Sequence, residues 1–247
     1  MDRLIYIAMN GAKSTLEQQA VLANNLANVS TTGFKAQLSA FRALPVVGEG
    51  AKTRVFVVDT TVGADLSQGP ILQTGRKLDV AVQGDGWIAV QGKDGREAYT
   101  RAGDLQLNSN GLLQTRSGLN VLREGGPITV PPNNDVYIGA DGTVSTIPRD
   151  STPNVVDIVG RLKLVNPPAK ELERGADGLF RLKSGGLAPA DGGVQLATGA
   201  LEGSNVSMVA ALVDMISQAR QYETQVKLLQ TAQDNSRQWS QVMSISA

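Results

Sequence analysis

The stretch LDVAVQGDGWIAVQGKDG, residues 78–95, decides the class of fold. It holds two short apolar runs, Leu78–Val82 and Trp87–Val90, and an Asp-Gly dipeptide follows each run. Asp-Gly and Asn-Gly favour tight hairpin turns because both residues tolerate a positive φ. The stretch therefore predicts antiparallel strands joined by short turns.

The same pattern extends through the middle of the chain. Further apolar runs are Arg54–Val58, Leu105–Leu107 and Val136–Ile138, and the turn dipeptides are Asp85-Gly86, Asp94-Gly95, Asn110-Gly111, Ser117-Gly118, Asp141-Gly142 and Asp177-Gly178. Residues 155–165 alternate in polarity and predict one long strand. All 10 prolines lie between Pro45 and Pro189, and no glycine follows Gly203. The middle is therefore predicted to be mainly β, and the two ends to be helical, because Gly and Pro are costly inside helices.

The C-terminal end has the spacing of an amphipathic helix from about Ser207 to Ser244. Its apolar or small residues recur every three or four positions, at Val209, Leu212, Ile216, Ala219, Tyr222, Val226, Leu229, Ser236, Trp239 and Met243. Such a narrow stripe is typical of a coiled coil. Ser204-Asn205 offers side chains that can cap the start of this helix.

The N-terminal end predicts a second helix that stops near Asn28. Its stripe comprises Ile5, Ala8, Met9, Ala12, Leu16, Ala20, Ala23 and Leu26. Two interpretations of the terminal helices are evenly matched. Either they pair only with each other, or they are assembly elements whose weakly charged outer faces contact neighbouring chains.

Composition excludes several classes of function. The 23 basic residues balance the 23 acidic ones, so nucleic acid is not an expected partner. The absence of Cys and His removes thiol and imidazole catalysis and nearly all transition-metal sites, and no cofactor motif is present. No apolar stretch is long enough for a secretory signal or a membrane-inserted span. We expect export, if it occurs, to use no cleaved signal peptide.

Four carboxylates are candidates for catalysis. Asp85, Asp94, Asp104 and Asp141 would suit glycoside hydrolysis, which uses a pair of carboxyl groups. Three of them precede Gly, however, where Asp favours the turn conformation. Trp87 is a candidate for stacking on a sugar, but a lone aromatic in an apolar run more often lies in the core. The turn and core interpretations are favoured.

Residues 24–35, NNLANVSTTGFK, resemble the signature of the bacterial flagellar rod and hook protein family. Two more blocks agree in order: residues 78–87 with YTRAG at 99–103 and NGLL at 110–113, and then LEGSNV at 201–206 with RQYE at 220–223. The short length and the opening MDRLIY are most similar to members from the proximal rod. Trp87 replaces the usual Phe, and Ser207 replaces a common acidic residue.

The resemblance implies a mainly β, antiparallel, hairpin-rich central domain and α-helical coiled-coil termini. The expected segments are an N-terminal rod-core helix (1–35), a β-rich connector (36–77), a β-rich outer domain (78–202) and a C-terminal rod-core helix (203–247). It further implies a structural, non-enzymatic subunit of the flagellar basal body, exported by the flagellar type III apparatus to the periplasmic rod. Its partners would be other rod proteins and copies of itself, assembling from a monomer whose ends are largely disordered.

Particular residues are expected at the assembly interface. They are Asn24, Asn25, Leu26, Asn28, Phe34, Asn205, Val209, Leu212, Ile216, Tyr222, Val226 and Leu229. For the asparagines of the signature, hydrogen bonding to the chain's own backbone is the competing role. Two other functions remain open at this point. One is a secreted glycan-binding or glycan-cleaving protein near peptidoglycan, and the other is a subunit of a phage-tail or adhesin fibre.

Overall fold

The computed structural model describes residues 2–45, 55–148 and 156–245. The chain forms two compact units. The helical unit contains residues 1–27, 37–63 and 206–247, and the β unit contains residues 28–36 and 64–205. The chain passes from one unit to the other after residues 27, 36, 63 and 205. The segments expected from the sequence end at residues 35, 77 and 202. The fold class agrees with the prediction, because a β-rich middle lies between two terminal helices.

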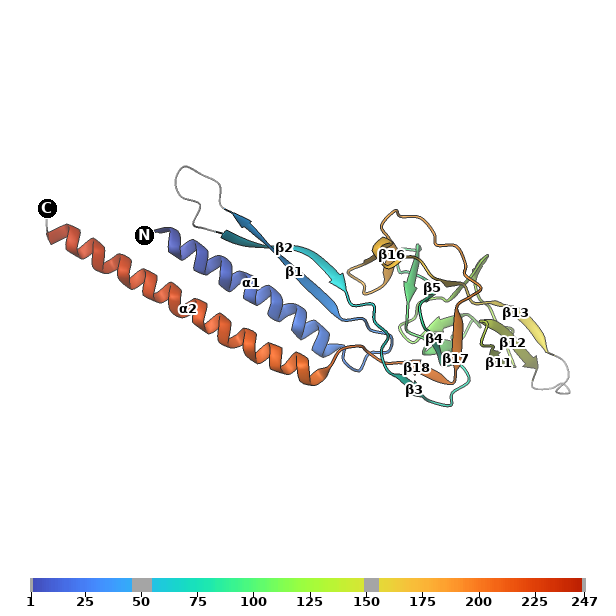
Figure 1. Ribbon diagram of the computed structural model, residues 1–247. Helices are drawn as coiled ribbons and strands as arrows, with labels where there is room; N and C mark the ends of the chain where they lie inside the picture. The colour runs from blue at the N-terminus through green and yellow to red at the C-terminus, as the bar shows by residue number, and fades with distance from the viewer. Residues whose placement is uncertain (1, 46–54, 149–155, 246–247) are drawn as a thin grey trace. The chain divides into compact units, whose positions relative to one another are not determined.

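In the helical unit, helix α1 (Asp2–Ala27) and helix α2 (Met208–Ile245) run antiparallel beside each other, with a hairpin of β1 (Gln37–Pro45) and β2 (Val55–Ala64) along α1 (Figure 1). Small side chains let the two helices approach closely. Ala8 and Ala12 are buried, and a Cβ added to Gly11 would lie 3.1 Å from the Gln225 side chain.

The predicted stripe of α1 is correct only in part. Ala8 and Ala12 are buried, but Met9 and Leu16 are 54% and 47% exposed. The buried face is instead continued by Thr15, whose hydroxyl donates to the carbonyl of Gly11 at 2.9 Å. One neighbouring helix covers only a narrow strip of a helical surface, so the strip with small residues is buried and the larger apolar residues beside it stay exposed.

The β unit is built from short antiparallel strands. Its largest sheet has the order β14-β5-β6-β16-β15, a second has the order β11-β12-β13, and the remaining strands form the pairs β17-β4, β18-β3, β7-β8 and β10-β9. The bounds are β3 Ile71–Gln73, β4 Val80–Gln83, β5 Trp87–Gln91, β6 Glu97–Thr100, β7 Leu105–Leu107, β8 Leu113–Thr115, β9 Leu122–Arg123, β10 Gly126–Pro127, β11 Asn134–Ile138, β12 Thr143–Pro148, β13 Asp157–Arg161, β14 Leu164–Val165, β15 Leu172–Arg174, β16 Phe180–Leu182, β17 Gln195–Thr198 and β18 Ala200–Glu202. A short 3₁₀ helix spans Ala169–Glu171.

The stretch 78–95 forms the two predicted strands and the predicted turns, but the two strands do not form a hairpin with each other, because β4 pairs with β17 whereas β5 pairs with β6 and β14. Its two runs become β4 and β5, which are buried along most of their length, and the glycine of every predicted turn dipeptide has a positive φ. Trp87 is a core residue, 4% exposed, and its ring centroid lies 4.5 Å from that of Phe180. The pairing of Ala89 with Tyr99 fixes the register between β5 and β6.

Two local predictions are wrong. Residues 155–165 do not form one strand, because the chain leaves the three-stranded sheet after Arg161 and enters the five-stranded sheet at Leu164. Residue 155 itself lies outside the described residues. Helix α2 is capped by Ser207, whose hydroxyl accepts from the Ala210 amide at 3.4 Å, rather than by Ser204-Asn205.

Neither α1 nor α2, over the residues that the structure describes, has the length and apolar content that a membrane span requires.

Candidate assembly sites

The segment that follows α1 in the chain, residues 28–36, is held inside the β unit by the segment around β18. The Gly33 amide donates to the backbone oxygen of Glu202 at 2.8 Å. Gly33 has φ +67°, and a Cβ there would lie 2.3 Å from the backbone of Arg101 and Ala102. Only glycine fits this position without displacing the backbone. The two ends of the β unit therefore meet at a close backbone contact.

Beside this contact lies an ionic cluster, which we define as Lys35, Arg101 and Glu202. Lys35 Nζ lies 2.6 Å from Glu202 Oε1, and Arg101 NH1 lies 2.9 Å from Glu202 Oε2. The side chains of Lys35 and Glu202 are fully buried, and that of Arg101 is 3% exposed. One carboxylate thus serves two buried cations.

Backbone groups complete the cluster. Lys35 Nζ donates to the carbonyl oxygen of Ser67 at 2.6 Å, and the Gly69 amide donates to Glu202 Oε1 at 3.0 Å. Arg101 NH2 donates to the Gly84 carbonyl at 2.8 Å. Burial lowers the pKa of Lys35, and the hydrogen bond and charge of Glu202 oppose that change. The charge of Glu202 is therefore what makes the burial of both cations tolerable.

Asn205 connects three segments through its amide. Its Oδ1 accepts from the Ala36 amide at 2.7 Å, and its Nδ2 donates to the carbonyls of Asp65 at 2.9 Å and Ser67 at 3.2 Å. Asn25, in the helical unit, exchanges two hydrogen bonds with the backbone of Gln37, at 2.8 and 2.9 Å. Both amides are used inside the chain; for Asn25 this is the competing role that the sequence allowed, whereas Asn205 was expected to cap α2.

The other expected residues of the signature lie in different surroundings. Asn24 is exposed, Leu26 and Asn28 are half-buried, and Asn28 Oδ1 accepts from the Thr31 hydroxyl at 3.1 Å. Phe34 is half-buried, with the Arg174 guanidinium carbon 4.6 Å from its ring centroid. Their part in assembly stays a prediction.

The expected residues of α2 divide into two groups. Tyr222, Val226 and Leu229 are half-buried. Val209, Leu212, Val213 and Ile216 are between 44% and 73% exposed, and we call these four residues the α2 apolar face. Their spacing of one, three, four and seven places them on one side of the helix. An exposed apolar face of this kind is a surface that a neighbouring chain can cover.

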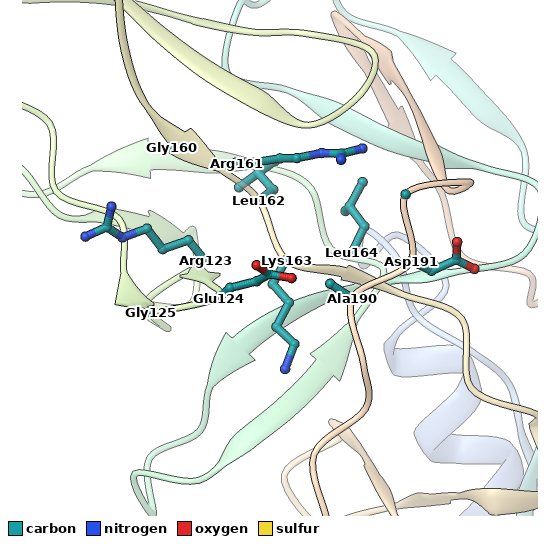
Figure 2. A pocket seen from close by; sticks show the side chains of 11 residues that line it. Arg123, Glu124, Gly125, Gly160, Arg161, Leu162, Lys163, Leu164, Ala190 and Asp191 are labelled. Carbon is teal, nitrogen blue, oxygen red and sulfur yellow. The ribbon is translucent and has the colours of Figure 1, made fainter.

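A pocket of about 520 Å³ in the β unit is a candidate for the alternative, glycan-directed function. Its lining includes the basic residues Arg123, Arg161 and Lys163 and the acidic residues Glu124 and Asp191. Figure 2 shows the three basic side chains pointing in different directions and the Asp191 carboxylate pointing away from Glu124. Glycoside hydrolysis needs two carboxyl groups facing one bond. The pocket does not favour that chemistry.

The candidate catalytic carboxylates have local roles. Asp94 accepts from the Arg96 amide and pairs with its guanidinium at 2.8 Å, and Asp141 accepts from the Thr143 amide and hydroxyl. Asp85 is exposed in its turn. Asp104 is buried opposite Asp79 in an antiparallel bridge. Among the described residues no group of three His, Cys, Asp or Glu is placed to hold a metal ion.

Asp104 predicts a dependence of stability on pH. Burial, and secondarily the charge of Asp79, raise its pKa above the ordinary 3.8. The folded state therefore favours protonated Asp104, and the stability that this proton contributes is lost as pH rises through the raised pKa. We expect Asp104→Asn to unfold at a higher temperature than the parent at neutral pH, with the difference vanishing below pH 3.8. Thermal unfolding from pH 3 to 8 checks this, with exposed Asp85→Asn as control. A destabilised Asp104→Asn protein at neutral pH would refute it.

Arg101 and Glu202 were not among the residues singled out from the sequence. Both lie in blocks that carry the family resemblance, YTRAG and LEGSNV. The available signal for a buried ion pair was a charged residue inside each of these otherwise apolar or turn-forming blocks. The pairing itself joins positions 101 residues apart, which no local pattern reveals.

Comparison with known proteins matches three parts of the chain. Residues 5–35 match the family described as flagella basal body rod protein, 81–146 the flagellar hook protein FlgE/F/G D1 domain, and 197–242 the flagellar basal body rod FlgEFG protein C-terminal family. The chain is 48% identical to flagellar basal-body rod protein FlgF of Salmonella typhimurium and to that of Escherichia coli, over an alignment of 252 positions that covers the whole of both chains. It is 31% identical to FlgG of Bacillus subtilis, over 95% of this chain and 96% of that protein.

Proposed function

We propose a function from one premise: the chain belongs to the family of flagellar basal-body rod proteins. It is a structural subunit of the flagellar basal-body rod. The observation that carries this conclusion is the full-length identity of 48% to rod proteins named FlgF, since FlgG relatives match at lower identity. We further propose that the chain occupies the proximal rod and catalyses no reaction.

The helical unit is proposed to supply the contacts between subunits. The α2 apolar face is exposed in the single chain, and burying it against a neighbour would remove apolar surface from water. A contact between different surfaces of identical or related subunits propagates as a helix when the rotation does not close. Such contacts between the terminal helices of copies of this chain and other rod proteins would give a stiff shaft that transmits torque.

The route to the rod follows from the same proposal. We propose that the flagellar type III export apparatus recognises the chain, that no signal peptide is cleaved, and that assembly takes place in the periplasm. The exported chain would be a monomer before it joins the rod. The support for this route is that the relatives of this chain are named as proteins of the flagellar basal-body rod.

Deletion of residues 207–247 tests the function. In cells lacking the intact chain, the shortened protein is expected to leave swimming abolished and basal bodies without a complete rod. The β unit keeps its own core, so the fragment is expected to remain folded by circular dichroism. Normal swimming with the shortened protein would overturn the structural role, whereas a glycan-directed protein would keep its activity.

Limited proteolysis tests the proposed state of the monomer. We expect protease to remove roughly thirty residues from each end before it cuts the β unit, because an isolated helix pair is weakly stabilised until neighbours cover it. Mass spectrometry of the fragments at successive times gives the order of cleavage. Equal resistance of the ends and the middle would contradict a monomer with loosely held ends.

A further inference from the structure

The exposed side chains of α1 follow a heptad pattern. Every exposed side chain that the structure describes in this helix, apart from Asn24, recurs at alternating steps of three and four residues. We call these residues the α1 seam, and they are Tyr6, Met9, Lys13, Leu16, Ala20, Ala23 and Ala27. A mean step of about 3.5 residues is the spacing of a coiled-coil contact. This side of α1 therefore has the pattern of a surface that packs against one further helix.

Helix α2 carries a second exposed stripe with the same spacing. We call it the α2 seam, and it consists of Val209, Val213, Ile216, Arg220, Glu223 and Lys227. Gln225 faces α1, because its side chain lies against Gly11. A helix turns by about 100° per residue. Ile216, nine positions before Gln225, and Glu223, two positions before it, therefore lie on the side of α2 that faces away from α1, so the two seams of one chain do not meet.

The contact between the two helices sets the level of each residue along the pair. Gly11 lies beside Gln225, and the helices are antiparallel, so each step forward in α1 corresponds to one step back in α2 (Figure 1). The seams consequently match position by position: Ala27, Ala23, Ala20, Leu16, Lys13 and Met9 are level with Val209, Val213, Ile216, Arg220, Glu223 and Lys227, respectively. A second copy placed beside the first, without a shift along the helices, would bring these levels together.

Side chains at matching levels are complementary in size and in charge. The three alanines of the α1 seam are level with the three branched aliphatic side chains of the α2 seam, so large side chains would face small ones. Lys13 is level with the opposite charge of Glu223. Within its own chain Lys13 lies 3.7 Å from Glu17 in an exposed pair, which holds it only weakly. The remaining levels place basic side chains, whose aliphatic stems can cover apolar surface, opposite Leu16 and Met9.

Resting on the proposed rod function, we propose that the α1 seam of one copy receives the α2 seam of a second copy at this level. The occupant is a second copy because one chain carries both halves of the match in spacing, size and charge. The two surfaces differ, so the contact is head-to-tail and repeats from subunit to subunit. The proposal thus names the surface that covers most of the α2 apolar face.

Because the chain has no cysteine, two single-cysteine chains can test this contact. Full-length Ala20→Cys and Ile216→Cys chains, distinguished by tags, are produced together in cells lacking the parent, and their basal bodies are isolated and oxidised. We expect a mixed disulfide dimer at least about five times more abundant than from Ala20→Cys with Ser217→Cys, since a disulfide requires matched positions and directions of both Cβ atoms. Ser217 is the matched control, because it is exposed and adjacent to Ile216 but lies about 100° further round α2.

The outcomes separate this contact from the rod function. A mixed dimer above the Ser217 control supports the contact. No excess over that control, an equal dimer from Ile216→Cys alone, or a disulfide to another rod protein would overturn it. Chains that enter basal bodies without cross-linking refute only the contact, whereas absence of the parent chain itself from basal bodies refutes the rod function. If only the cysteine chains fail to enter, the exchange of charges described next decides.

Exchanging two charges tests the register. Lys13→Glu and Glu223→Lys are each expected to lower the yield of complete basal bodies by about twofold or more, because like charges would then face each other across the contact. The double variant is expected to restore the yield. Its matched control is Lys13→Glu with Asp214→Lys, which makes the same charge changes but uses an exposed acid outside the α2 seam. Single variants without effect, or restoration by both double variants or by neither, would refute the register.

Discussion

Replacing Glu202 by Gln is expected to destabilise the β unit by roughly 3–5 kcal/mol, the usual cost of removing one partner of a buried ion pair. Gln keeps the size of the side chain and can still accept the hydrogen bond from Gly69, which Glu202 accepts at 3.0 Å. It removes the only carboxylate that pairs with the buried Lys35 and Arg101 among the described residues. The loss therefore comes from charge rather than from packing.

Denaturant unfolding of the full chain measures the effect. The β unit is monitored by the fluorescence of Trp87 in a Trp239→Phe background, because the second of the 2 tryptophans lies in α2. Lys35→Met is the informative partner variant, because Glu202 would still pair with Arg101 at 2.9 Å. We expect it to cost less than Glu202→Gln, and the double variant to cost less than the sum of the two. Exposed Glu173→Gln serves as the control for removing a carboxylate.

A Glu202→Gln protein that unfolds within about 0.5 kcal/mol of the parent, the range of an ordinary surface substitution, would contradict the role of the cluster. Its position gives the cluster wider importance. It joins residue 35, shortly after α1, to residue 202, shortly before α2. The ionic cluster of the β unit therefore forms only when both of these distant segments are in place.

Local patterns in the sequence predicted both helices and several of the strands, but not the short strands β3 and β15 to β18. The apolar runs at 78–82 and 87–90 became β4 and β5, and the dipeptides between runs became turns, because strand and turn preferences act over a few residues. The helix boundaries were also close, since α1 ends at Ala27 and α2 begins at Met208. The long strand over 155–165 failed because alternation cannot show that a chain changes sheets midway.

The candidate sites were less predictable for a physical reason. Asn205 looks like a helix cap in sequence, but its amide is occupied by Ala36, Asp65 and Ser67, which only the folded β unit brings together. Met9 and Leu16 fit a helical stripe, yet α2 packs on the smaller residues beside them. Periodicity shows that a helix has an apolar side, and close packing decides which part of that side is covered.

Introducing Leu212→Asp and Ile216→Asp together is expected to abolish swimming while leaving the isolated chain folded. Both side chains are exposed in the single chain, at 44% and 56%, so the substitutions remove little packing. We therefore expect the free energy of unfolding to change by less than about 1 kcal/mol.

In an assembled rod the same two carboxylates would lie in the proposed contact, where each buried, unpaired charge costs several kcal/mol. The matched control is Ser217→Asp with Gln221→Asp, which adds the same charges at the same spacing on exposed polar positions of α2. Swimming and the yield of complete basal bodies are compared for the two double variants in cells lacking the parent chain. Loss in both would show that added charge alone is harmful, and loss in neither would exclude the α2 apolar face from the interface. Only selective loss with Leu212 and Ile216 fits a helix whose apolar face is completed by its neighbours.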